Sequence, residues 1–152
     1  MNIFKCGEHN YRAGVISAKK QFHIVRRLAP LLGGLGPLLS KAKQIKDGGG
    51  KAGDMSEEEM AAVLPAITEA LAKMDDETAD YVIFGLLAEV TREQPNGLGW
   101  APVSAGESLM FVDINMSQMI TLAVRSLMAN LGDFFVVLNS ISSQLGQKAK
   151  GQ

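Results

Sequence analysis

The sequence has little of what catalysis and metal binding usually need. The 152-residue chain contains one cysteine, Cys6, and two histidines, His9 and His23. Cys6 and His9 have a Cys-x-x-His spacing, but a structural zinc site needs four ligands and His23 could supply only a third of the same kind. A catalytic cysteine needs a base and an electropositive, partly exposed pocket. We therefore expect no metal, no cofactor and no catalytic residue.

Acidic residues are more plentiful, but they stand where helices begin. Glu57–Glu59 follow Ser56, and Asp75–Glu77 precede an apolar helical stripe. Carboxylates are favoured at helix N-termini, where they accept hydrogen bonds from unpaired backbone N–H groups and meet the positive end of the helix dipole. We interpret both clusters as caps rather than as paired catalytic carboxylates. An enzyme is the weakest function class for this chain.

The chain also lacks the features of secreted and membrane proteins. A single cysteine excludes an internal disulfide, and the first residues, MNIFKCGEHNYR, lack the apolar segment of a secretory signal. The longest apolar runs, such as 81–88 and 134–138, fall short of the roughly 18–20 residues that cross a bilayer. We expect a soluble protein of a reducing compartment with no membrane contact.

Charge is nearly balanced overall, at −1, but it is unevenly distributed. Residues 1–53 hold ten Lys or Arg against Glu8 and Asp47, which gives +8, and residues 54–93 hold eleven acids against Lys73 and Arg92, which gives −9. Nucleic-acid binding usually adds a reading helix or stacking aromatics to a basic stripe. We favour a basic segment that faces the acidic one, within the fold or across to a neighbouring subunit.

Apolar residues at three- and four-residue steps predict one mainly α-helical domain over residues 1–152. About five helices are expected, at 17–32, 56–74, 75–90, 113–131 and 133–145, with a further brief helix at 38–46. The expected N-caps are Ser17, the capping box at Ser56–Glu59, Asp75 or Asp76, and Asp113. Pro30 and Pro65 are expected to kink or end their helices. Leu131-Gly132 is expected to separate the last two helices before Asp133.

Turn signals divide the remainder of the chain. Ile3–Cys6 and Asn10–Arg12 flank Gly7-Glu8-His9 and predict a short N-terminal β-hairpin. Residues 100–112 predict a loop or a small hairpin. We expect a flexible glycine-rich loop at about 47–54 and a frayed tail at 147–152.

The stretch from Met116 to Leu145 is almost uncharged, with only Arg125 and Asp133. Two helices this apolar are either the centre of the core or a surface that meets another chain, and methionine-rich surface suits varied partners. We favour a surface for client binding or self-association, with the core alone as the alternative. The candidate residues for this surface are Phe22, Val25, Met116, Met119, Ile120, Leu127, Met128, Phe134, Phe135 and Leu138.

Several segments, in their order and spacing, resemble the tail assembly chaperones of tailed bacteriophages and prophages. They are the opening strand–turn–strand that ends in Asn10-Tyr11-Arg12, the segment SAKKQFHIVRRLAPLL at 17–32, Trp100-Ala101-Pro102-Val103, LMFVDI at 109–114, and NLGDFF at 130–135.

This resemblance implies a mainly helical protein of the host cytoplasm that binds the tape measure protein and keeps it soluble while tail subunits polymerise around it. It also implies the tail tube protein as a further partner, and a homo-oligomer. Two alternatives stay open. One is a tail-completion or minor tail subunit that remains in the virion, and the other is a small regulator whose basic segment 19–46 binds nucleic acid.

Overall fold

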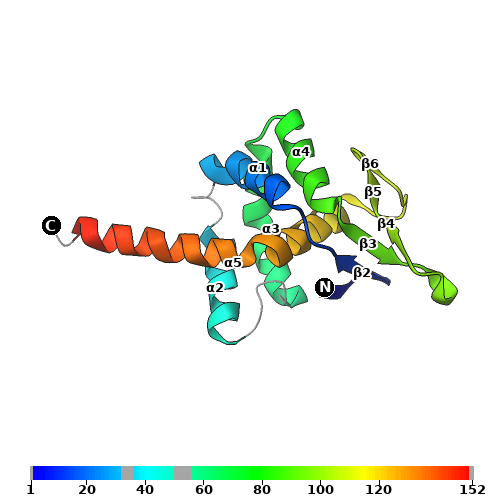
Figure 1. Cartoon of the computed structure of the whole chain (residues 1–152), viewed down its shortest axis with the longest axis horizontal. Coiled ribbons are helices and arrows are strands. Elements are labelled where there is room, and N and C mark those ends of the chain that lie inside the picture. The colour runs from blue at the N-terminus through cyan, green and yellow to red at the C-terminus, as the bar shows by residue number, and fades with distance from the viewer. Residues whose placement is uncertain (1, 32–35, 50–55, 151–152) are drawn as a thin grey trace.

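The computed structural model describes residues 2–31, 36–49 and 56–150 (Figure 1). Helices dominate this part of the chain, as the sequence predicts, but two antiparallel sheets make the fold mixed α/β rather than purely α. The helices are α1 (Ala18–Leu28), α2 (Gly36–Asp47), α3 (Glu57–Ala72), α4 (Asp76–Leu87) and α5 (Met116–Lys150). The strands are β1 (Asn2–Cys6), β2 (His9–Ala13), β3 (Val90–Glu93), β4 (Trp100–Pro102), β5 (Ser104–Ala105) and β6 (Ser108–Leu109), with one 3-10 turn, η3, at Pro95–Gly97.

The C-terminal helix α5 corrects the largest error in the sequence prediction. The two helices expected to be separated at Leu131-Gly132 form a single 35-residue helix. A glycine ends a helix when it adopts a left-handed conformation, but Gly132 is helical and buried, and Leu131 is 3% exposed. Packing on both sides of this glycine outweighs its weak helix propensity.

The helix also begins differently from the prediction. Its first turn is closed by Asn115, whose Oδ1 accepts the Gln118 N–H at 2.8 Å, while Gln118 Oε1 accepts the Asn115 N–H at 3.0 Å. Asp113, the expected cap, binds Arg92 instead. At the other end α5 runs to Lys150, past Gln147 where we expected the tail to fray.

Because α5 is continuous, it is long enough to cross a bilayer, contrary to our estimate from shorter apolar runs. Residues 116–137 meet the length and composition test, yet more than half of the most apolar window is buried inside the protein. The core helix of a soluble protein passes the same test. Arg125, which is 7% exposed within this stretch, lies against the rest of the protein, with its guanidinium 5.4 Å from the Phe4 ring.

The other helix boundaries agree well with the local signals. The Ser17 hydroxyl accepts the Lys20 N–H, and α1 ends at Leu28 before a 3-10 turn that includes Pro30. The capping box predicted at Ser56 and Glu59 is present, with both reciprocal hydrogen bonds, and α3 continues through Pro65. Asp75 caps α4. Most of the expected loop at 47–54 lies outside the described residues.

The expected N-terminal hairpin is part of a four-stranded antiparallel sheet with the order β1-β2-β3-β4. We expected Val90 at the end of a helix, but α4 stops at Leu87 and Val90 pairs with Ala13 of β2. Residues 104–109 form the small hairpin β5–β6, as predicted for the 100–112 region. The sheet therefore depends on pairings across about 80 residues of sequence, which periodicity alone does not reveal.

The core lies between α5 and the elements that surround it. Figure 1 shows α5 passing through the middle of the molecule, with the sheet near its N-terminal end and its C-terminal part projecting beyond the other helices. One face of the sheet is buried, while the Arg12 guanidinium on the opposite face lies 4.5 Å from the centre of the Trp100 ring. The side chains that are 0–1% exposed include Tyr11, Ile24, Val63, Leu87, Val90, Leu122, Met128 and Phe135.

Asn130 of α5 fixes the connection between β2 and α1. Its Oδ1 accepts the Ile16 N–H at 2.8 Å, and its Nδ2 donates to the Gly14 carbonyl oxygen at 3.1 Å. Ile16 is 3% exposed, so its N–H has little access to water if this side chain is removed. One amide thus satisfies two backbone groups that neither helix nor sheet uses.

We predict that Asn130→Ala lowers the free energy of unfolding by about 1–3 kcal/mol, because it leaves backbone polar groups unsatisfied. Urea unfolding followed by circular dichroism measures this. The matched control is Asn10→Ala, which removes an exposed side-chain hydrogen bond to Glu93 and should change stability by less than about 0.5 kcal/mol. Equal midpoints for the two variants would contradict the role of Asn130.

Arg92 and Asp113 join the sheet to the segment that precedes α5. The Arg92 Nη1 donates to both oxygens of Asp113, at 2.9 and 3.0 Å, and its guanidinium lies 4.1 Å from the centre of the Phe111 ring. The His9 Nε2 lies 3.4 Å from the same carboxylate. The hydrogen bond from Arg92 holds the pKa of Asp113 below its ordinary value.

A carboxyl group with a lowered pKa in the folded state stabilises the protein above the unfolded pKa, about 3.9, and loses this effect as pH falls through the folded pKa. We predict that Asp113→Asn lowers the urea midpoint at pH 7 and flattens its dependence on pH below about 4. Urea titrations from pH 7 to pH 2.5 test this. Parallel curves for the wild type and the variant would show that the ion pair contributes nothing.

The adjacent residues Phe134 and Phe135 provide a direct test of which face of α5 is in the core. Phe135 is 0% exposed and Phe134 is 45% exposed. We predict that Phe135→Ala costs about 3–5 kcal/mol of unfolding free energy, because it leaves a cavity in the core. Phe134→Ala should cost less than about 1 kcal/mol. Comparable losses for both would mean that this part of α5 is rotated from the position described.

Candidate protein-binding surface

Three of the ten residues expected on the binding surface belong to the core. Leu127 is 3% exposed, Met128 1% and Phe135 0%. They lie on the inner face of α5, so in this fold they stabilise the chain and are not part of its exposed surface. For these residues the alternative interpretation, an apolar helix at the centre of the core, describes the structure.

The other candidates are divided among separate places. Val25, Met119 and Ile120 are partly buried against the core. Phe22 is 61% exposed on α1, with its ring centre 5.3 Å from that of His23. Met116 is 72% exposed at the start of α5. The side chain of Leu138 lies outside the described part of the structure.

In residues 116–137, the part of α5 whose side chains the structure describes, the exposed large apolar residues lie near the two ends. Phe134 and Val137, which is 57% exposed, stand three residues apart and therefore on one side of the helix; we call them the α5 outer face. At the other end Met116 follows the exposed Val112. Met116 and Phe134 are 18 residues apart, about 27 Å along a helix axis. The buried Leu127 and Met128 lie between them.

Sequence reasoning missed two exposed apolar residues, Val137 of the α5 outer face and Val15 of the connection between β2 and α1. Val137 continues the three- and four-residue spacing that runs through positions 134, 138, 141 and 145, so the pattern could have identified it. Val15, which is 79% exposed, had no such signal. It lies in the connection that Asn130 holds, and Asn130 is one helical turn before Phe134.

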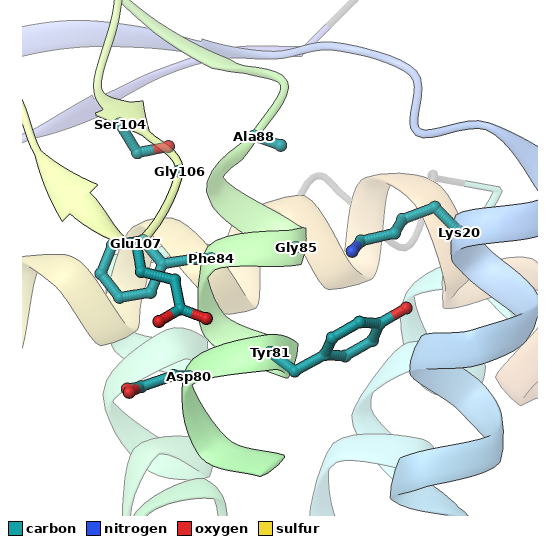
Figure 2. Close-up of a pocket in the computed structure, with 9 residues that line it drawn as sticks. All are labelled: Lys20, Asp80, Tyr81, Phe84, Gly85, Ala88, Ser104, Gly106 and Glu107. Atoms are coloured by element: carbon teal, nitrogen blue, oxygen red, sulfur yellow. The ribbon is translucent and has the colours of Figure 1, made fainter. Parts of the chain in front are cut away.

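A cavity of about 340 Å³ lies between α1, α4 and the β5–β6 hairpin (Figure 2). Lys20 Nζ and Arg27 Cζ lie 3.9 and 4.0 Å from the centre of the Tyr81 ring, so α1 meets α4 through cation–π contacts. A Cβ on Gly85 would come within 2.9 Å of the Lys20 side chain, so glycine permits this close approach. The basic helix α1 thus packs against α4, which belongs to the acidic segment 54–93, but its cations contact the Tyr81 ring rather than a carboxylate.

The charged groups that line this cavity lie on two sides of α4 (Figure 2). Figure 2 shows the Asp80 and Glu107 carboxylates on one side of α4 and the Lys20 ammonium on the other, around Phe84 and Gly85. The lining residues include no histidine or cysteine. In the described part of the chain, no group of three or more His, Cys, Asp or Glu side chains is placed to hold a metal ion.

Cys6 lies at the end of β1 and is 9% exposed. Burial raises the pKa of its thiol, and the positive charge of Arg125 opposes this only in part. The thiol is therefore protonated near neutral pH, unlike a nucleophilic cysteine, whose pKa is lowered.

Comparison with known proteins identifies the family. No curated protein and no solved structure matches the chain. A family model described as "Phage tail assembly chaperone protein, TAC" matches residues 7–145, which include all the elements from β2 to β6 and most of α5. The chain therefore belongs to the phage tail assembly chaperone family.

Proposed function

We propose that this chaperone binds the tape measure protein through the α5 outer face, keeps it soluble and helps to recruit tail tube subunits. The observation that carries the proposal is the exposure of Phe134 and Val137 on a helix whose C-terminal part projects beyond the other helices (Figure 1). Membership of a tail assembly chaperone family supports a protein client.

The energetics of this face suit a helical client. Fully burying an exposed large apolar side chain contributes about 1.5–3 kcal/mol, and because Phe134 and Val137 are already about half-buried, the two together contribute about that much to a weak contact. Asp133 is the single charge on α5 between Ser126 and Val137. An amphipathic client helix that packs its apolar stripe along α5 would bury this face without pairing many charges.

The same exposed helix supports the remaining parts of the proposal. An apolar face that a client leaves open can also pair with a second copy, so the chaperone forms homo-oligomers when no client is bound. Its site of action is the host cytoplasm, where tails assemble. A chaperone family also suggests a non-enzymatic protein.

Co-expression with the tape measure protein of the same phage or prophage tests this function. We predict that the wild-type chaperone raises the soluble fraction of the tape measure protein and co-elutes with it. The double variant Phe134→Asp, Val137→Asp should lose at least about tenfold in affinity, since two charges would be buried at the contact. Its own fold should persist, because both positions are exposed.

Val112→Asp is the matched control, because Val112 is fully exposed beyond the opposite end of α5 and should leave binding unchanged. An unchanged complex with the double variant would refute the α5 outer face as the contact. If the protein instead occurs at stoichiometric copy number in purified virions, a structural tail subunit replaces the chaperone function.

A further inference from the structure

Within the part of the chain that the structure describes, no strand pairs with the outer edge of β1, which leaves some of its backbone hydrogen-bonding groups open. Gly14 N–H donates to the Glu89 carbonyl oxygen at 2.8 Å, so the even-numbered residues of β2 bond to β3 and the odd-numbered ones bond to β1. Tyr11 pairs with Phe4 and His9 pairs with Cys6. The N–H and C=O groups of Ile3 and Lys5 therefore point away from β2, toward the open edge.

The opposite edge of the sheet carries a proline at one of its outward positions. In β4, Val103 N–H donates to the Val90 carbonyl oxygen, so Ala101 bonds to β3 and Pro102 faces outward. Proline has no N–H, which makes it a common residue for blunting an exposed edge. In β1 the outward positions are Ile3 and Lys5, and both retain the N–H group that a pairing strand needs.

A cleft of about 230 Å³ lies directly beside this open edge. Lys5, Cys6 and Gly7 of β1 and its turn form one wall, Met60 and Leu64 of α3 lie across from them, and α5 provides Thr121 and Arg125. In Figure 1 the N-terminal part of α3 lies next to β1. The cleft therefore lies between the sheet and α3, and α5 contributes to its lining.

We propose that this β1–α3 cleft binds an extended segment of the client protein, which adds a fifth strand to the sheet by pairing with Ile3 and Lys5. The proposal rests on the proposed function, because the client supplies the segment. A cleft with a strand edge as one wall and a helix as the other suits an extended chain, which is the arrangement of β-strand addition. A strand at the edge of another folded sheet is less suitable, because the rest of that sheet would also have to fit against α3.

The charges in the cleft indicate which segment fits. Lys5 contributes a positive charge at an outward position of the strand edge, and Met60 and Leu64 of α3 contribute apolar surface. The matching segment carries an acidic side chain beside Lys5, and alternate apolar side chains toward α3. It is a different part of the client from the helix proposed for the α5 outer face.

Lys5→Pro tests the strand addition in the complex with the tape measure protein. The substitution removes an outward N–H and leaves the hydrogen bonds between β1 and β2 intact, so the urea midpoint should not change. We expect affinity for the client to fall about tenfold. Lys5→Ala keeps the N–H, removes only the charge, and should lose less affinity than Lys5→Pro.

Amide hydrogen exchange measured by NMR gives a second readout. On client binding, the Ile3 and Lys5 amides should exchange at least about tenfold more slowly, while the Phe4 amide, already bonded to β2, should change little. Unchanged exchange at Ile3 and Lys5 would overturn the proposal.

The outcomes also separate this proposal from the proposed function. If the α5 double variant loses the client and Lys5→Pro keeps full affinity, strand addition fails and the function stands. If the wild type binds no tape measure protein, both fail. If Lys5→Pro changes the mass of the chaperone alone in light scattering and leaves client affinity intact, the cleft binds a second copy and the client proposal is wrong.

Discussion

The burial of one long apolar helix is the constraint on which this fold depends. Leu122, Met128 and Phe135 of α5 are 0–1% exposed, and α2, α4 and the N-terminal sheet all pack against this helix. The polar contacts serve the same arrangement, since Asn130 fixes the β2–α1 connection to α5, and Asp113, held by Arg92, lies just before its first turn. Without α5 the sheet would have one exposed apolar face and no second layer.

The sequence predicted those parts of the fold that depend on neighbouring residues. The caps at Ser17, Ser56 and Asp75 are confirmed because each needs only a side-chain oxygen three residues before a backbone N–H. The strand at Val90–Glu93 was missed, since its pairing with β2 joins residues about 80 positions apart. Gly132 gave a false stop signal, because tertiary packing rather than local propensity decides whether a buried glycine stays helical.

The candidate surface shows the same limit. Sequence composition identified α5 as unusually apolar, and that is confirmed, but it could not separate Phe134, which is exposed, from Phe135, which is in the core. Both faces of the helix carry apolar residues here, so the spacing of apolar residues does not show which face packs in the core. The missed Val15 was beyond any pattern, because it lies in the connection between β2 and α1, which has no periodicity and which Asn130 holds through Gly14 and Ile16.

The two proposed contacts lie along the same helix, which bears on how a long client would be held. Thr121 lines the β1–α3 cleft and Val137 belongs to the α5 outer face, and these residues are 16 apart, about 24 Å along the axis. A client bound at one contact is thereby kept at a high effective concentration near the other, so two weak contacts give a tight complex. In the proposed function, each contact alone would be weak enough to release when tail subunits compete for the client. A chaperone that must give up its client gains from this division, because loss of either contact loosens the other.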